Sequence, residues 1–240
     1  MIIPARYLSS RFPGKALAPL KNRPLLQHVF DKAKSCRLAS DVVIATDSAE
    51  ILEAARSWGA KAVMTSKEHP SGTDRVAEAA REIKAEIIVN LQGDEPVIRP
   101  EMIDDVIMLM ADASADIGTL VRRIESVEEF RDPNVVKAVF DQSGRALYFS
   151  RSPIPFPRDG GEGFLPCAYK HIGMYAYRRE SLFRLSGQKP TRLEQVEKLE
   201  QLRALENGMI IKVKESEFDS IGVDTPEDLK KVEKWLSSYS

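Results

Sequence analysis

Residues Ile87-Ile88-Val89-Asn90-Leu91 form an apolar run that ends directly in the polar turn Gln92-Gly93-Asp94. A run of this length is too short for a helix and is typical of a strand buried on both faces. Runs of the same kind occur at Ile2-Ile3, Val42-Val43-Ile44-Ala45 and Ala62-Val63-Met64. The sequence therefore predicts four buried strands in its first half.

Helical patterns lie between these runs. Their starts are marked by Pro24 at a first helical position, by Asp47 with Glu50 as a capping-box-like pair, and by Ser71 or Thr73 as a cap. Strands that alternate with helices at this spacing pair mainly in parallel, through right-handed crossovers. The expected fold class is α/β, with a mostly parallel sheet flanked by helices.

The pattern changes after about residue 115, where strand signals become longer and pair differently. Two runs, 135–140 and 146–149, flank the turn 141–144 and predict a hairpin. Residues 171–177 alternate like a further strand. Apolar side chains at 193, 196, 199 and 202 predict one face of a helix. We expect a smaller elaboration in the second half of a single domain.

Composition excludes several classes of protein. The 240 residues carry 35 Lys and Arg against 36 Asp and Glu, which gives no general attraction for nucleic acid or membranes. Two isolated cysteines, Cys36 and Cys167, predict neither a disulfide framework nor a zinc site. No apolar run reaches the length of a membrane span. A strand begins at the N-terminus without a signal sequence, so we expect a cytoplasmic protein.

Three cations follow the first strand within ten residues: Arg6, Arg11 and Lys15. The loop that carries them should lie beyond the carboxyl end of a strand, where open α/β sheets bind ligands. Guanidinium and ammonium groups with free backbone N–H groups suit a triphosphate. A solvated basic loop is the alternative, but the preceding strand and the Pro-Gly-Lys ending favour phosphate binding.

Two carboxylates stand at junctions between an apolar run and a helix. Asp94 follows the run 87–91, and Asp224 lies in Gly222-Val223-Asp224-Thr225-Pro226. Mg²⁺ is commonly held by one or two carboxylates together with phosphate oxygens, so both are candidate ligands. Either residue by itself could equally serve a turn or a helix cap.

Two further groups have both a chemical and a structural interpretation. Residues 69–75 offer hydroxyls, amides and Arg75 at a helix start, which suits a base or ribose edge, although capping alone would explain Ser71 and Thr73. Glu194 and Glu197 are three residues apart, so their carboxylates share a helix face that is usually a solvated stripe.

Taken together, these segments closely resemble the 3-deoxy-D-manno-octulosonate (Kdo) cytidylyltransferases, or CMP-Kdo synthetases. The resemblance covers nearly the whole chain in family order. The second-half blocks separate Kdo enzymes from sialic acid activators. It is carried by Ile3-Pro4-Ala5-Arg6, Arg11-Phe12-Pro13-Gly14-Lys15, Ala45-Thr46-Asp47, Ser71-Gly72-Thr73-Asp74-Arg75, residues 90–96, Ala146-Leu147-Tyr148-Phe149-Ser150-Arg151, Lys170-His171-Ile172-Gly173-Met174-Tyr175, residues 193–203 and residues 222–228.

The resemblance implies a role for each candidate residue. Lys15, Asp94 and Asp224 would be catalytic, and the two aspartates would hold Mg²⁺. The CTP site would comprise Arg6, Arg11, Lys15, Ser71, Gly72 and Arg75. The sugar acid would be bound by Gln92, Arg151, His171, Tyr175, Glu194, Gln195 and Glu197. Gln195 is at a position that varies in the family.

The same resemblance implies a Rossmann-like nucleotidyltransferase sheet in one domain, 1–240. Residues 1–115 would mainly bind CTP, about 116–215 would mainly bind the sugar and form dimer contacts, and 216–240 would return to the core with Asp224. The expected activity is transfer of CMP from CTP to the anomeric hydroxyl of Kdo for lipopolysaccharide biosynthesis, by a homodimer. The alternatives are a cytidylyltransferase for another acceptor, such as a sialic acid, and a non-catalytic nucleotide-sugar sensor.

Overall fold

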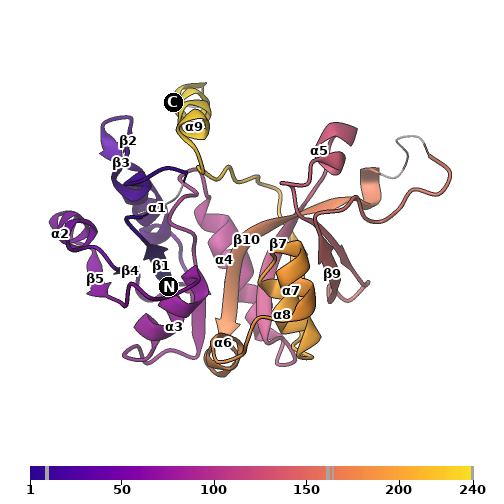
Figure 1. Ribbon diagram of the computed structural model, residues 1–240, viewed down its shortest axis with the longest axis horizontal. Coiled ribbons are helices and arrows are strands. Elements are labelled where there is room, and N and C mark those ends of the chain that lie inside the picture. The colour runs from indigo at the N-terminus through magenta and orange to yellow at the C-terminus, as the bar shows by residue number, and fades with distance from the viewer. Residues whose placement is uncertain (9–10, 161–162, 164, 239–240) are drawn as a thin grey trace. The chain divides into compact units, whose positions relative to one another are not determined.

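The computed structural model describes residues 1–8, 11–160, 163 and 165–238. The chain forms two compact units (Figure 1). Unit 1 comprises Met1–Asp104 and Ser220–Ser240, and unit 2 comprises Asp105–Asp219. The division falls within helix α4 (Pro100–Met108). No helix in the described ranges has both the length and the apolarity to cross a bilayer.

Unit 1 is built on a parallel sheet of four strands in the order β6-β1-β4-β5. The strands are β1 (Ile2–Ala5), β4 (Val43–Thr46), β5 (Lys61–Met64) and β6 (Ile87–Asn90). Every residue of β4 is buried, as the apolar run predicts. The prediction of a buried strand at 62–64 is wrong, because β5 is an edge strand and Val63 and Met64 are exposed. Because the strands are parallel, the loops that follow them begin at one edge of the sheet.

The helices of unit 1 are amphipathic and bury one face each. They are α1 (Leu25–Lys34), α2 (Ala49–Ser57), α3 (Gly72–Ala80), the first part of α4, and α9 (Pro226–Ser238). A short 3₁₀ turn, η1 (Lys15–Leu17), and the small hairpin of β2 (Pro19–Leu20) with β3 (Arg23–Pro24) join β1 to α1.

Two predicted helix starts are corrected. Ser48, not Asp47, caps α2, since its side chain accepts the N–H of Ile51 and the Asp47 carboxylate is used elsewhere. Pro24 precedes α1 instead of forming its first turn, because it pairs with Pro19 in the small hairpin. For α3, Ser71 rather than Thr73 is the cap, as one of the two predicted choices.

Unit 2 has a mixed sheet. Strand β7 (Ile117–Arg123) lies between β11 (Ile211–Glu215), which is parallel to it, and β10 (Tyr169–Arg178), which is antiparallel. The predicted hairpin is present as β8 (Lys137–Phe140) and β9 (Ala146–Ser150), and β8 also pairs with β10. The register of β10 shifts at a bulge between Ile172 and Tyr175.

Short helices complete unit 2: η2 (Leu109–Ala111), α5 (Val127–Arg131), η3 (Leu165–Cys167) and α6 (Arg179–Ser186). The single helix predicted over 193–202 is instead two, α7 (Arg192–Glu197) and α8 (Gln201–Glu206). Between them Lys198 has a φ of 55°, a left-handed conformation that ends α7. Leu199 and Leu202 are buried, but Val196 is 75% exposed.

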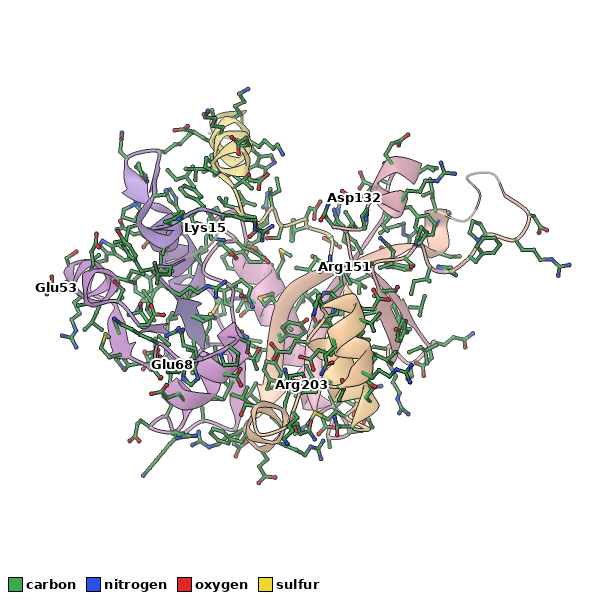
Figure 2. All side chains as sticks on the ribbon, in the orientation of Figure 1. Lys15, Glu53, Glu68, Asp132, Arg151 and Arg203 are labelled. Atoms are coloured by element: carbon green, nitrogen blue, oxygen red, sulfur yellow. The ribbon has the colours of Figure 1, made fainter. Side chains whose placement is uncertain are left out.

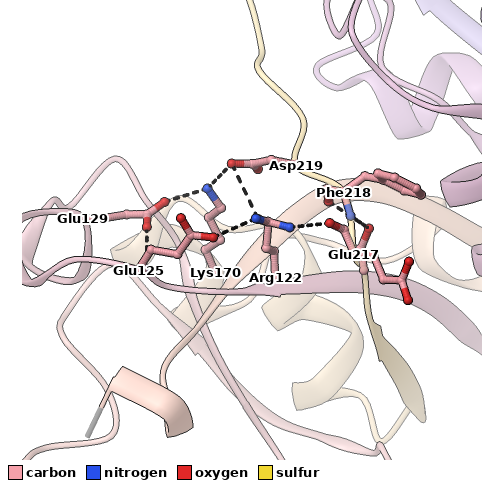
Figure 3. A network of polar contacts seen from close by, with 8 residues as sticks. Arg122, Glu125, Glu129, Lys170, Glu217, Phe218 and Asp219 are labelled. Atoms are coloured by element: carbon pink, nitrogen blue, oxygen red, sulfur yellow. Dashed lines mark hydrogen bonds and ion pairs between the residues drawn. The ribbon is translucent and has the colours of Figure 1, made fainter. Parts of the chain in front are cut away.

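A polar network ties the last residues of unit 2 to α5 and β7 (Figure 3). The Lys170 ammonium donates to Glu129 and Asp219 at 2.6 Å each, and the Arg122 guanidinium donates to the Glu217 carbonyl and to Glu125. Burial by itself would lower the pKa of Lys170, but its two carboxylate partners raise it above the ordinary value. Lys170 therefore stays charged and holds the segment that leads into residue 220.

Candidate functional site

The loops at the carboxyl edge of the unit 1 sheet enclose a polar cleft. All nine predicted site residues that belong to unit 1, with Gln92 and Asp224 among them, line it. Their gathering follows from the parallel pairing of β1 and β6, which brings residues far apart in sequence to one edge. The lining residues are Pro4, Ala5, Arg6, Arg11, Lys15, Ala16, His69, Pro70, Ser71, Gly72, Arg75, Gln92, Gly93, Asp94 and Asp224.

Lys15, labelled in Figure 2, lines this cleft and contacts two carboxylates there. Its Nζ atom is 2.7 Å from Oδ2 of Asp94 and 3.4 Å from Oδ1 of Asp224. The Arg11 guanidinium lies 3.0 Å from the other oxygen of Asp224. Two carboxylates and two cations from three distant segments therefore meet at one place.

Local packing fixes the two carboxylates. The N–H of Val223 donates to the backbone carbonyl of Asp94 at 2.9 Å, which joins the two loops. Val223 itself is fully buried beside Leu20 and Val232, and this anchors the residue before Asp224. Burial of such a side chain stabilises by roughly 1.5–3 kcal/mol, so the position of Asp224 rests on the hydrophobic core.

Gly93 allows the loop after β6 to lie against the loop after β1. A Cβ atom at this position would be 2.9 Å from the Pro4 carbonyl oxygen and 3.2 Å from a methyl group of Leu26. Backbone oxygen cannot move aside as a flexible side chain can. The close approach that brings Asp94 to Lys15 therefore requires glycine here.

The arrangement is suited to a metal-bound phosphate. Among the described residues no group of three or more His, Cys, Asp or Glu side chains is placed to hold a metal ion. Two carboxylates are nevertheless what Mg²⁺ uses when phosphate oxygens supply other ligands, so Asp94 and Asp224 fit it. Arg6, exposed on the cleft wall, has no hydrogen-bond partner within the described ranges and is available to an anion. Ser9 and Ser10 of this loop lie outside those ranges.

The other wall of the cleft is the start of α3. The Ser71 hydroxyl accepts the N–H of Asp74 and donates to its carboxylate, so it serves as a helix cap. Arg75 is buried and its guanidinium donates to Asp47 at 2.7 Å and to Thr65 at 2.5 Å. Arg75 thus lines the cleft while joining the loops after β4 and β5.

Two residues that were not predicted as site residues belong to the site: His69 lines the cleft, and Asp47 lies outside the lining and contacts it through Arg75. Asp47 holds Arg75 and also accepts the N–H of Tyr7, so it links the β4 loop to the phosphate-binding loop candidate. His69 lines the cleft and pairs with Glu78. The sequence signal was present, because both belong to polar segments that follow strands, but their partners are set by the tertiary structure.

In unit 2, Arg151 (labelled in Figure 2) and Glu197 are brought together. The Glu197 carboxylate accepts the Ser150 hydroxyl at 2.6 Å and the Arg151 backbone N–H at 2.9 Å. The Arg151 guanidinium donates to the backbone carbonyls of Glu197 and Pro133, at 2.7 and 3.0 Å. Arg151 therefore closes the end of α7 onto β9.

His171 and Tyr175 are neighbours on β10, with ring centroids 5.3 Å apart. The Thr119 hydroxyl lies 2.9 Å from His171 Nε2 and donates its proton to the Met174 carbonyl at 2.8 Å. We infer that it accepts Nε2–H, which leaves Nδ1 as an acceptor. Burial lowers the pKa of His171 to about 3, so the imidazole is neutral at physiological pH.

Glu194 and Gln195 are engaged in local structure. Glu194 completes a capping box with Thr191, and its two oxygens accept hydrogen bonds from Arg203 at 2.5 and 2.8 Å in a nearly buried ion pair. Gln195 donates to the Pro190 carbonyl at the surface. Glu194 and Glu197 thus share a helix, but their carboxylates have different partners, and the roles proposed for them in sugar binding stay predictions.

Comparison with known proteins gives consistent results. The family model described as "Cytidylyltransferase" matches residues 1–215. The 3-deoxy-manno-octulosonate cytidylyltransferase of Thermodesulfovibrio yellowstonii is 54% identical, covering 100% of this chain and 98% of that protein. The enzyme of the same name from Geobacter metallireducens is 53% identical over 99% and 97%. A solved CMP:2-keto-3-deoxy-manno-octonic acid synthetase complexed with CTP has a TM-score of 0.94 and 41% identity, covering 100% of this chain and 98% of that one.

Proposed function

The chain belongs to the 3-deoxy-manno-octulosonate cytidylyltransferase family, and we propose that it transfers CMP from CTP to Kdo, giving CMP-Kdo and pyrophosphate. Membership of this family confirms the resemblance to the Kdo cytidylyltransferases. The fold shared with the solved synthetase confirms the predicted class, an α/β Rossmann-like nucleotidyltransferase sheet. The product serves lipopolysaccharide biosynthesis. The single observation that carries the proposal is the convergence of Lys15, Asp94 and Asp224 in one cleft of a chain with this ancestry.

The reaction is a displacement at phosphorus. The anomeric C2 hydroxyl oxygen bonds to the α-phosphorus, the bond to the β-phosphate bridging oxygen breaks, the hydroxyl proton is released, and pyrophosphate leaves with the bonding electrons. Such a step depends mainly on in-line alignment and charge neutralisation. We assign neutralisation of the triphosphate to Arg6, Arg11 and Lys15, and we name no side-chain base.

We propose Asp94 and Asp224 as the residues that hold Mg²⁺. The bound cation would neutralise phosphate charge and lower the pKa of a hydroxyl that it coordinates. Lys15 and Arg11 form ion pairs with these same carboxylates. Their positive charges would therefore lie beside both the metal ligands and the phosphate oxygens that we assign to this cleft.

The cytidine would be held along the start of α3, by Ser71, Gly72 and Arg75. Because the Ser71 hydroxyl is used as a cap, its backbone is the group available to the nucleotide. The roles in sugar-acid binding predicted for Gln92, and those predicted for Arg151, His171, Tyr175, Glu194, Gln195 and Glu197, stay predictions. The predictions that the enzyme is a homodimer and cytoplasmic stay predictions.

The deciding assay measures pyrophosphate release and identifies the nucleotide-sugar product by mass spectrometry. The purified chain is incubated with Mg²⁺ and CTP, and with Kdo, a sialic acid or no acceptor in separate reactions. We expect CMP-Kdo only with Kdo, and no comparable product when ATP replaces CTP, because a purine is larger than cytosine. Turnover of the sialic acid alone would identify the other acceptor class, and CTP binding without turnover would indicate a sensor.

A further inference from the structure

Residue Ser66 on the loop after β5 is held at both of its backbone polar groups by α3. Its N–H donates to the Glu78 carboxylate at 2.9 Å, and its carbonyl accepts Arg75 Nη1 at 3.2 Å. The two side chains are three residues apart, so they lie on one face of the helix. One face of α3 therefore holds Ser66 by hydrogen bonds to both its N–H and its carbonyl group.

Glu78 makes a second contact with this loop. The oxygen that accepts the Ser66 N–H also lies against Nε2 of His69. The Ser66 N–H, and after it His69, hold the pKa of Glu78 below its ordinary value although burial opposes them. Glu78 is thus a carboxylate at neutral pH, and it joins the beginning and the end of the segment 66–69.

The segment leads directly into the wall of the cleft. His69, Pro70, Ser71 and Gly72 are consecutive and all line it, whereas Glu78 does not. An exposed loop loses conformational freedom when it is ordered, and that cost falls on ligand binding unless the loop is already fixed. Side chains that fix 66–69 before a ligand arrives therefore act on the affinity of this wall.

We propose that Glu78 is a positioning residue for nucleoside recognition, which pre-organises the wall 69–72 through Ser66 and His69. This inference rests on the proposed function and adds to it a residue outside the cleft. It assigns Glu78 to the cytidine part of the nucleotide, because the cations of the phosphate-binding loop, Arg6, Arg11 and Lys15, make no contact with Glu78 among the described interactions.

The test compares two ligands of the full chain by titration calorimetry at fixed Mg²⁺: CTP, and inorganic tripolyphosphate as a probe without the nucleoside. In Glu78→Ala we expect the Kd for CTP to rise on the order of 10-fold, as for loss of charged hydrogen bonds. The Kd for tripolyphosphate should stay within about twofold of wild type. Glu78→Gln keeps an acceptor for Ser66 and should recover part of the loss.

Glu82→Gln is the matched control, because Glu82 is an exposed carboxylate four residues further along, just past the end of α3 and outside the cleft lining. It should bind both ligands like wild type. Unchanged CTP binding in Glu78→Ala, or an equal loss of both ligands, would overturn the inference in favour of a purely structural role. If Glu78→Ala does not fold, the same comparison is made with Glu78→Gln. Failure of the wild-type chain to bind CTP would instead overturn the proposed function.

Discussion

The ammonium of Lys15 lies 2.7 Å from the carboxylate of Asp94, and both side chains are largely shielded, with 14% and 33% exposure. Asp224, the second carboxylate near Lys15, is 53% exposed and more distant at 3.4 Å. An exposed ion pair contributes little to stability, whereas a shielded one leaves an uncompensated charge when it is broken. The two aspartates therefore differ structurally, even though we assign both to the metal.

This difference predicts a separable result for Asp224→Asn and Asp94→Asn. Both should lower the rate by on the order of 10²–10⁴-fold, the range expected when a metal contribution of several kcal/mol is lost. The free energy of unfolding of Asp224→Asn should stay within about 1 kcal/mol of the wild-type value. That of Asp94→Asn should fall by about 1.5–3 kcal/mol, because Lys15 loses its nearest partner.

Steady-state kinetics over a Mg²⁺ series and urea unfolding measure the two effects. Glu227→Gln is the control, because this exposed carboxylate lies three residues from Asp224 and does not line the cleft. A folded Asp224→Asn enzyme with near-normal turnover at limiting Mg²⁺ would remove Asp224 from the metal site.

Gly93→Ala should displace Asp94 without changing any charged group. The added methyl would meet the Pro4 carbonyl oxygen at 2.9 Å, so the loop after β6 has to move. We expect a loss of about 1–3 kcal/mol in the free energy of unfolding, as for other overpacked sites, together with reduced kcat. Gly222→Ala is the matched control, because a Cβ there meets nothing within 4 Å. Equal behaviour of the two variants in thermal melting and turnover would contradict the packing explanation.

The sheet of unit 1 could be predicted because its strands are short, apolar and bounded by polar turns. The runs at 42–45 and 87–91 are apolar except for Asn90, and β4 and β6 occupy them to within one residue. Helix ends were less predictable. The apolar spacing of 193–202 continues through Lys198, and the break there depends on tertiary contacts of the α7 terminus with Arg151 that periodicity does not encode.

The cleft was predictable in part for the same reason. Residues at the carboxyl ends of parallel strands must meet, so Lys15 and Asp94 could be placed together from the sequence. The contacts of Asp47 with Arg75, and of Glu78 with Ser66, could not be. These contacts join segments whose positions relative to one another are set by tertiary packing. For Asp47, helix capping was an equally good explanation from the local sequence.

The buried imidazole of His171 should make the free energy of unfolding depend on pH in the acid range. Burial lowers its pKa to about 3 in the folded chain, whereas an unfolded histidine titrates near 6.5. The unfolded chain therefore binds a proton below about pH 6.5 that the folded chain does not bind until about pH 3, so stability falls as the pH falls through this window. Between pH 8 and pH 5 this group should account for about 2 kcal/mol.

His171→Gln removes that titration, so its urea-unfolding free energy should fall less between pH 8 and pH 5 than that of wild type. The comparison is of the pH dependence, which is independent of any constant stability change from losing the Thr119 contact. The same decrease in both proteins would show that His171 is not held neutral.

Arg151→Lys tests whether Arg151 binds the carboxylate of the sugar acid or closes the end of α7. Its guanidinium contacts the carbonyls of Glu197 and Pro133, and a lysine cannot make both of these contacts with one planar group. If Arg151 also binds the acceptor, kcat/KM for Kdo should fall about 10- to 150-fold while CTP affinity stays near wild type. If it only joins α7 to β9, the melting temperature should fall and kcat/KM for Kdo should not.

Arg158→Lys changes an exposed arginine on the following loop and is the control for loss of a guanidinium. We expect the kinetic result, because Arg151 presents two further N–H groups on Nη2 that no described contact uses.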